Sequence, residues 1–155
     1  MEELRGGADV VLKKIMRQAA AERASDVHIE PGASFVRVRF RKDGLLSDRF
    51  CLSSSMAPNL SVRVKVLGRL DVGESRLPQD GSWAEEIDGV PYDFRISVLP
   101  SMYGETIVIR ILSGRVNFIE KNELGMRREQ ESLFRRALSK GQGLILTTGP
   151  TGSGK

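Results

Sequence analysis

The chain has 155 residues, of which 40% are hydrophobic and 28% charged, and its formal net charge is +4. This length suits one compact domain with at most part of a second, which excludes a large multidomain enzyme. The hydrophobic content excludes a disordered chain. No apolar stretch approaches the roughly 18 residues of a membrane-spanning helix, and no signal peptide starts the sequence, so we expect a cytoplasmic protein. The single cysteine, Cys51, excludes an intrachain disulfide and a multi-thiolate metal site.

The basic residues are mostly arginine, with 17 arginines among the 24. A guanidinium group is planar and permanently charged, and it suits phosphate and carboxylate partners. Most arginines in a protein are nevertheless ordinary exposed residues. Composition therefore hints at a phosphate partner, and the positions of individual arginines must show which of them could bind one.

The first part of the sequence predicts a helix followed by paired strands. Over residues 8–23, apolar side chains recur at helical spacing without Pro or Gly, which indicates an amphipathic helix. Residues 26–30 and 35–40 alternate between polar and apolar side chains, as half-buried strands do. An Asp-Gly pair at 43–44 indicates a hairpin turn into a strand over 45–52. We therefore expect an antiparallel sheet.

The middle of the sequence is less uniform. Residues 53–71 leave helix and strand both open, because Val62, Val64 and Val66 alternate while other apolar residues are spaced three and four apart. Residues 71–82 lack sustained apolar spacing and predict a long loop, and long loops are often functional. Three further strands are expected, over 83–87, 90–98 and 105–112, and an Asp-Gly pair at 88–89 is expected to join the first two in a second hairpin.

The last part of the sequence changes character. Residues 116–128 read as a connector, 128–140 as a short amphipathic helix, and 144–148 as a continuous apolar strand of the kind found in parallel sheets. We expect an α+β domain over residues 1–115, a connector over 116–128, and the start of an α/β domain over 129–155.

A phosphate-binding loop ends the sequence. The last seven residues are Gly149, Pro150, Thr151, Gly152, Ser153, Gly154 and Lys155. They match G-x-x-x-x-G-K after an expected strand, where backbone N–H groups can surround a phosphate and the lysine can reach the outer phosphates. The hydroxyl residue that would follow and hold Mg²⁺ is absent, as are later acidic residues. We therefore expect a piece of a longer P-loop ATPase that is inactive by itself and holds no catalytic residue.

Five motifs occur in order along the chain. They are Ala24 to Pro31 (Ala-Ser-Asp-Val-His-Ile-Glu-Pro), Arg76 to Gly81, Arg95 to Ser97, Tyr103 to Glu105 with Arg110, and Gly149 to Lys155. Together they resemble the signatures of the type II secretion and type IV pilus assembly ATPases. The resemblance covers about Val10 to Lys155, and it favours the general secretion pathway protein E and pilus extension branch.

The resemblance implies a hexameric, cytoplasmic ATPase that uses ATP and Mg²⁺ and drives protein secretion or pilus assembly. Such a motor lies at the inner membrane through platform proteins. The chain would then hold a PAS-like antiparallel sheet with flanking helices, the N2 domain of this family, followed by the start of a RecA-like P-loop domain. The resemblance also favours a helix over 58–69.

The resemblance assigns phosphate contacts to Arg95 and Arg110, with Arg76 a weaker candidate. Each of the first two interrupts an apolar strand and so needs a partner, although strand alternation alone would place an arginine on a solvated sheet face. Ser82 stands where the family often has arginine, which weakens any grip of the 76–81 loop on phosphate.

Other polar residues have ordinary interpretations. Asp26, His28 and Glu30 share one strand face, but without a second histidine we expect hydrogen bonding rather than a metal site. Glu105 lies in a strand-entry motif, where a structural role is favoured over that of a general base. Two other functions stay open: a non-enzymatic oligomerisation or docking module, and a basic nucleic-acid-binding domain suggested by Arg37, Arg39 and Arg41. We rank nucleic acid last, because few aromatic residues are available for stacking, and expect no nucleic-acid partner.

Overall fold

The computed structural model of the chain describes residues 6–113 and 125–149. These residues fall into two compact units, one within residues 1–116 and the other within residues 117–155. The connector expected over 116–128 lies mostly outside the described residues, as do residues 150–155 of the phosphate-binding motif.

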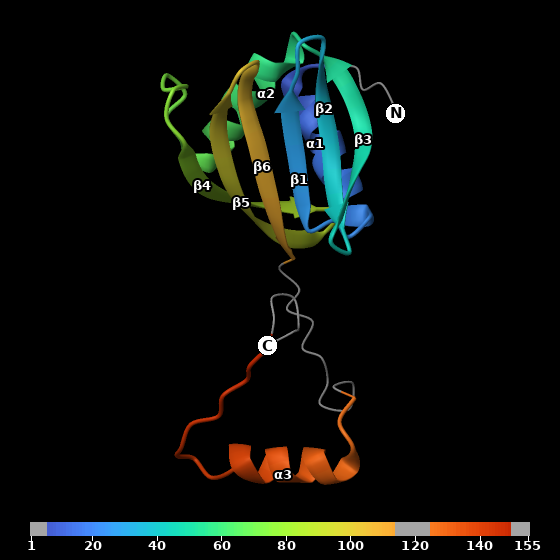
Figure 1. The fold of residues 1–155 in the computed structure, drawn as a ribbon, viewed down its shortest axis with the longest axis vertical. Helices are drawn as coiled ribbons and strands as arrows, with labels where there is room; N and C mark the ends of the chain where they lie inside the picture. Colours follow the sequence, from blue (N-terminus) through green and yellow to red (C-terminus); the bar gives the residue numbers. More distant parts are fainter. Residues whose placement is uncertain (1–5, 114–124, 150–155) are drawn as a thin grey trace. The chain divides into compact units, whose positions relative to one another are not determined.

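The first unit contains one six-stranded sheet and two helices. The helices are α1 (Ala8–Ala21) and α2 (Met56–Gly68), and the strands are β1 (Asp26–Pro31), β2 (Phe35–Lys42), β3 (Leu45–Ser53), β4 (Gln79–Ile87), β5 (Val90–Ser101) and β6 (Gly104–Ser113). The strand order is β3-β2-β1-β6-β5-β4, and every neighbouring pair is antiparallel. The first and last strands of the unit thus lie side by side in the middle of the sheet (Figure 1).

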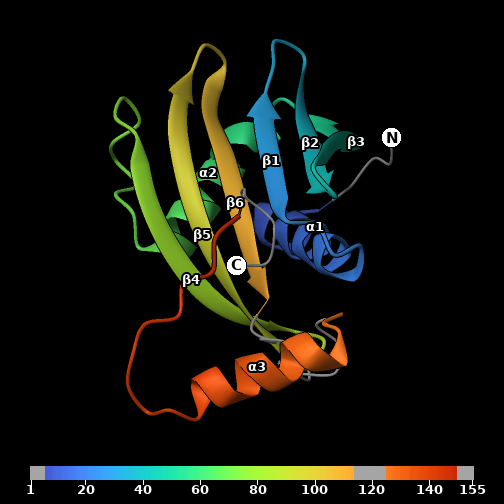
Figure 2. The ribbon, with the colours of Figure 1, turned by 60° about the horizontal axis from the view of Figure 1, so that its bottom comes forward.

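Both helices cover the same face of this sheet (Figures 1 and 2). Apolar side chains of α1, α2 and the strands form one core, in which Val11, Leu60, Ile109 and Phe94 are fully buried. The opposite face, here called the open face, carries the alternating polar side chains. The expected α+β class, with an antiparallel sheet and flanking helices, is confirmed. Among the described residues, no helix is both long and apolar enough to cross a membrane.

Two hairpin turns have the predicted chemistry. At 43–44 and at 88–89, both the aspartate and the glycine have positive φ, between 50° and 81°. This is the left-handed conformation of type I′ turns, whose twist matches that of the flanking strands. The local sequence therefore sets the register of β2 with β3 and of β4 with β5.

The segment that left helix and strand open is the helix α2. Its buried residues Leu60 and Val64 are four apart and face the core, whereas Val62 and Val66 are half exposed. The loop expected over 71–82 is shorter than predicted, because β4 already begins at Gln79 and pairs along its length with β5. Pairing with a neighbouring strand overrode the weak local pattern.

The second unit contains the helix α3 (Arg128–Leu138), close to the expected 128–140. The strand predicted over 144–148 was wrong for this structure, because these residues are not in a strand. Leu144 is 80% exposed and Leu146 76% exposed. A strand buried on both faces needs neighbouring strands and covering helices, and within 125–149 the structure has no strand for it to pair with.

Gly81 lies where β4 passes the end of α2 at close range. A Cβ atom at this position would lie 2.7 Å from the backbone oxygen of Gly68 and 2.7 Å from Leu70 Cδ2. We expect Gly81→Ala to lower the free energy of unfolding by about 1–3 kcal/mol, since overpacking forces the backbone apart. Chemical denaturation measures this change.

Gly73→Ala is the matched control for Gly81→Ala. Gly73 lies in the loop before β4, and its added Cβ would meet only Asp71 Oδ1, at 3.4 Å. Its stability should change little. Equal effects of the two substitutions would contradict the close approach at Gly81.

Candidate functional site

A row of charged side chains crosses the open face. The strand register aligns Arg95 of β5 with Arg110 of β6, Arg110 with Asp26 of β1, and Asp26 with Arg41 of β2. Residues directly opposite in antiparallel strands point to the same face. We call these four residues the arginine row. The two arginines assigned to phosphate from the sequence are therefore brought together.

Arg110 has one carboxylate partner in the row. Its Nε donates to Asp26 Oδ1 at 3.0 Å, and its side chain remains 65% exposed. Asp26 is only 6% exposed, and its second oxygen accepts a hydrogen bond from Ser25 Oγ at 2.8 Å and lies 3.5 Å from Arg41 Nε. The aspartate is thus buried between two guanidinium groups.

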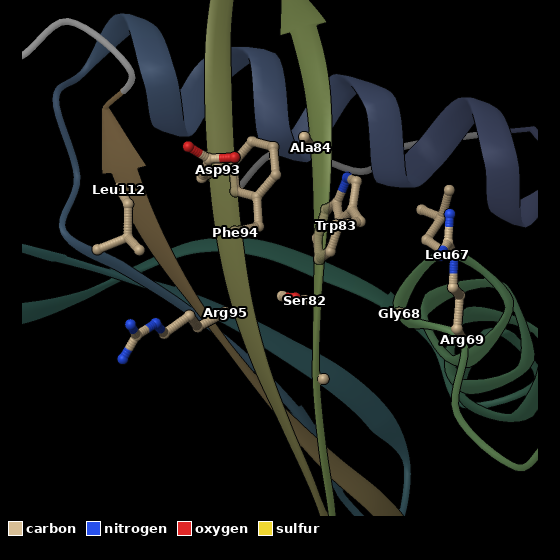
Figure 3. A pocket seen from close by; sticks show the side chains of 11 residues that line it. Leu67, Gly68, Arg69, Ser82, Trp83, Ala84, Asp93, Phe94, Arg95 and Leu112 are labelled. Carbon is tan, nitrogen blue, oxygen red and sulfur yellow. The ribbon is translucent and has the colours of Figure 1, made fainter.

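Arg95 differs from Arg110 in having no such partner. Within the described residues, its side chain makes no hydrogen bond or ion pair, and it is exposed. Arg95 and Arg110 both line a shallow hollow on the open face, together with Asp80 and Ser97, which hydrogen-bond each other at 2.5 Å. Arg95 also lines a second hollow at the β4 edge, where Figure 3 shows its side chain pointing away from α2. A cation in this position is open to an anionic ligand.

Arg76 lies apart from this arrangement, in the loop between α2 and β4. Its Nη2 is 3.1 Å from Glu74 Oε2, and its side chain is 88% exposed. The hydrogen bond from the Arg76 side chain, helped by its backbone N–H, lowers the pKa of Glu74. Arg76 has its own carboxylate partner, and no contact among the described residues joins it to the arginine row.

A buried lysine, which the sequence pattern did not point to, holds the loop that carries Arg76. Lys65 of α2 is 1% exposed and donates to the backbone oxygen of Glu74 at 2.7 Å. Lys65 Nζ also lies 2.6 Å from Glu105 Oε1, an ion pair, and the other oxygen of Glu105 accepts from Ser61. Glu105 thus has the structural partners that its position in a strand-entry motif predicted.

Gln79, the first residue of β4, also holds this loop by hydrogen bonds. Its amide nitrogen donates to the backbone oxygens of Asp71 and Glu74, and its amide oxygen accepts from the N–H of Asp71 at 2.8 Å. The Gln-Asp-Gly motif at 79–81 therefore holds the loop and the strand edge in place.

The other polar residues of β1 are His28 and Glu30, and His28 Nδ1 lies 3.9 Å from Glu30 Oε1. Burial, with a contribution from the Arg41 charge, lowers the pKa of His28, and its buried Nε2 has no hydrogen-bond partner among the described residues. Glu30 pairs with Arg39 at 2.5 Å. No group of three or more metal-binding side chains occurs in residues 6–113 or 125–149.

The three arginines of β2 are largely engaged within the protein. Arg39 pairs with Glu30, and Arg41 lies beside Asp26. Arg37 packs its guanidinium over the Phe35 ring at 5.8 Å. Two of the three thus have carboxylate partners already, which weakens the case for a nucleic-acid surface on this strand.

Of the predicted phosphate-binding loop, only Gly149 is described. It is exposed and follows the irregular segment 143–148. The remaining predicted residues, Pro150, Thr151, Gly152, Ser153, Gly154 and Lys155, lie outside the described residues. The loop stays a prediction from the sequence.

Comparison with known families places the chain. The family model described as "Type II/IV secretion system protein" matches residues 5–155, almost the whole sequence. The chain belongs to this family. The resemblance stated from the five motifs is thereby confirmed.

Curated relatives of this secretion-system protein support the same family assignment. It is 44% identical to the protein transport protein HofB homolog of Escherichia coli over 145 residues, and 39% identical over 145 residues to the type II secretion system ATPase E of Vibrio cholerae. It is 40% identical to the type IV pilus assembly ATPase PilB of Acinetobacter baylyi over 157 residues. These matches cover 94–99% of the chain but only 27–32% of the relatives. The secretion-system protein thus spans about a third of their length.

A solved structure shares the fold. The X-ray structure of the Legionella pneumophila ATPase DotB matches with a TM-score of 0.54 at 18% identity, over all of this chain and 41% of DotB. At this identity the match supports the fold alone.

Proposed function

We propose that this chain forms the nucleotide-closing domain and the first part of the motor domain of an ATPase for protein secretion or type IV pilus assembly. The chain's family and its relatives support this activity. The sheet domain would occupy residues 1–115 and the connector 116–128, and residues 129–155 would begin the RecA-like domain.

The observation that carries the proposal is the alignment of Arg95 with Arg110 on the open face. Two like charges directly opposite each other repel and destabilise a sheet unless an anion lies near them. Asp26 balances one of them, and Arg95 keeps an unused guanidinium among the described residues. A phosphate group arriving at the hollow would supply the missing negative charge.

The proposed chemistry is charge stabilisation during phosphoryl transfer. The residues Gly149 to Lys155 would hold the triphosphate of ATP, and the sheet domain would close so that Arg95 and Arg110 contact the outer phosphates. Positive charge fixed at the γ-phosphate stabilises the charge that develops in the transition state. Arg76, bound to Glu74, is the weaker third contact. ATP would bind as its complex with Mg²⁺.

The cellular setting that the family resemblance implied is also part of the proposal. The complete protein would form a hexameric ring in the cytoplasm and bind platform proteins of the inner membrane. ATP binding and hydrolysis would open and close the sheet domain against the motor domain.

A turnover measurement tests the proposal. A polypeptide that continues through a complete motor domain should hydrolyse ATP, and Lys155→Ala should abolish its turnover. Full activity of the Lys155 variant would contradict the assignment.

A further inference from the structure

Asp26 is a buried charged group to which the proposed function gives no task. It is the first residue of β1, in the middle of the sheet, and is 6% exposed. Burial raises the pKa of its carboxyl, but hydrogen bonds from Ser25 and Arg110 and the charges of Arg110 and Arg41 outweigh burial and lower it. The carboxylate is therefore charged at neutral pH.

The backbone around Asp26 holds this carboxylate in place. The N–H of Ser25 donates to the oxygen of Arg41 at 2.8 Å, and the N–H of Ile111 donates to the oxygen of Ser25 at 2.9 Å. These bonds join the residue just before β1 to β2 and to β6. Ser25 Oγ then donates to Asp26 Oδ2, which leaves Oδ1 directed to Arg110.

The contact with Arg110 uses one particular atom. Asp26 Oδ1 accepts from Arg110 Nε at 3.0 Å, and neither terminal nitrogen of Arg110, Nη1 or Nη2, donates a hydrogen bond to another described residue. A guanidinium group binds a phosphate through two parallel N–H donors. Held at Nε, Arg110 is fixed in orientation while its outer donors stay available.

We propose that Asp26 is a positioning residue that holds the Arg110 guanidinium by Nε, so that its terminal nitrogens meet a nucleotide phosphate beside Arg95. This inference rests on the proposed function. Without the aspartate, the repulsion between Arg95 and Arg110 would drive the two side chains apart. The loss would reduce the rate of hydrolysis more than the affinity for ATP, since the contact matters most when charge develops on the phosphate.

The test uses the polypeptide with a complete motor domain. Asp26→Asn keeps the shape and removes the charge, and Glu30→Gln is the matched control. Glu30 is an acidic residue on the same strand and face, but it pairs with Arg39 rather than with the arginines assigned to phosphate. We expect Asp26→Asn to lower kcat about tenfold or more with less than a threefold change in KM, and Glu30→Gln to leave both within about twofold.

Testing Asp26→Asn in a second protein variant distinguishes an effect on the position of Arg110 from a general loss of stability. In an Arg110→Ala protein, Asp26→Asn should lower kcat no further, because the residue through which it acts is gone. An equal additional drop in that background would overturn the proposal. If Arg95→Ala and Arg110→Ala both leave kcat unchanged, the proposed function fails. If either arginine variant lowers kcat but Arg110→Ala or Asp26→Asn does not, only the positioning role fails.

A measurement on the unmodified 155-residue chain is independent of how the variants fold. The hydrogen on Arg110 Nε should exchange with solvent at least about tenfold more slowly than that on Arg95 Nε in NMR spectra, because only the former is bonded to a carboxylate. Equal exchange rates would show that Asp26 does not hold Arg110.

Discussion

Replacing Arg95 or Arg110 by alanine, in a polypeptide that joins this chain to a complete motor domain, should lower ATP turnover about a hundredfold. Removal of one preorganised donor to a developing negative charge typically costs a factor of this size, and arginines at a transferred phosphate often contribute more. The two positions lie directly opposite in the sheet, so the double variant should lose less than the product of the single losses. Steady-state kinetics with ATP measure the effect.

Arg37→Ala is the matched control for this series. Arg37 lies on the same open face and its guanidinium contacts the Phe35 ring, outside the arginine row. Its replacement removes the same charge and should leave turnover within about twofold. Unchanged turnover in both the Arg95 and the Arg110 variants would end the phosphate assignment.

Glu105→Gln should produce the largest loss of stability among single substitutions of ion-paired residues in the sheet domain. Its partner Lys65 is 1% exposed, so neutralising the glutamate leaves an ammonium group buried without its counter-charge. Breaking a buried pair from one side costs about 3–5 kcal/mol. Chemical denaturation of the 155-residue chain measures the free energy of unfolding, and faster proteolysis in the 69–78 loop should accompany the loss, because Lys65 also holds Glu74.

Two further variants serve as the control and the rescue experiment for Glu105→Gln. Asp9→Asn removes a carboxylate that is 48% exposed and pairs with Lys13 and Arg63, and such surface pairs contribute about 0–1 kcal/mol. The double variant Lys65→Met with Glu105→Gln should recover part of the lost stability, because no unpaired charge remains buried. A Glu105 loss no larger than that of Asp9 would show that the pair is not effectively buried.

The elements of the sheet domain were largely predictable from local sequence. Apolar spacing set the helix α1, and the Asp-Gly pairs at 43–44 and 88–89 set two hairpins, because both signals act between residues close in the chain. The exact start of β4 was not predictable, since Gln79 is in a strand only through pairing with Val98. The apolar run 144–148 shows the same limit, because a buried strand forms only beside other strands.

The candidate site likewise has features that the sequence predicted and features that only the fold revealed. Family motifs pointed to Arg95 and Arg110 as separate strand residues, and their alignment came from the register of β5 with β6. The hydrogen bond between Asp26 and Arg110 was missed, although Asp26 lies in the first motif, because the two residues are 84 positions apart in the sequence. Lys65 was missed because nothing in the sequence of an amphipathic helix shows that one lysine is buried and faces a glutamate of a remote strand.

The sequence by itself determined the family, most helices and strands of the sheet domain, the tight turns and the arginines that carry the proposed chemistry. Only the tertiary structure decided that β1 and β6 join two hairpin systems into one sheet, which places Asp26 between Arg110 and Arg41. The physical reason is distance along the chain. Local conformation depends on neighbouring residues, whereas a cross-strand contact depends on how remote segments pack around a shared core.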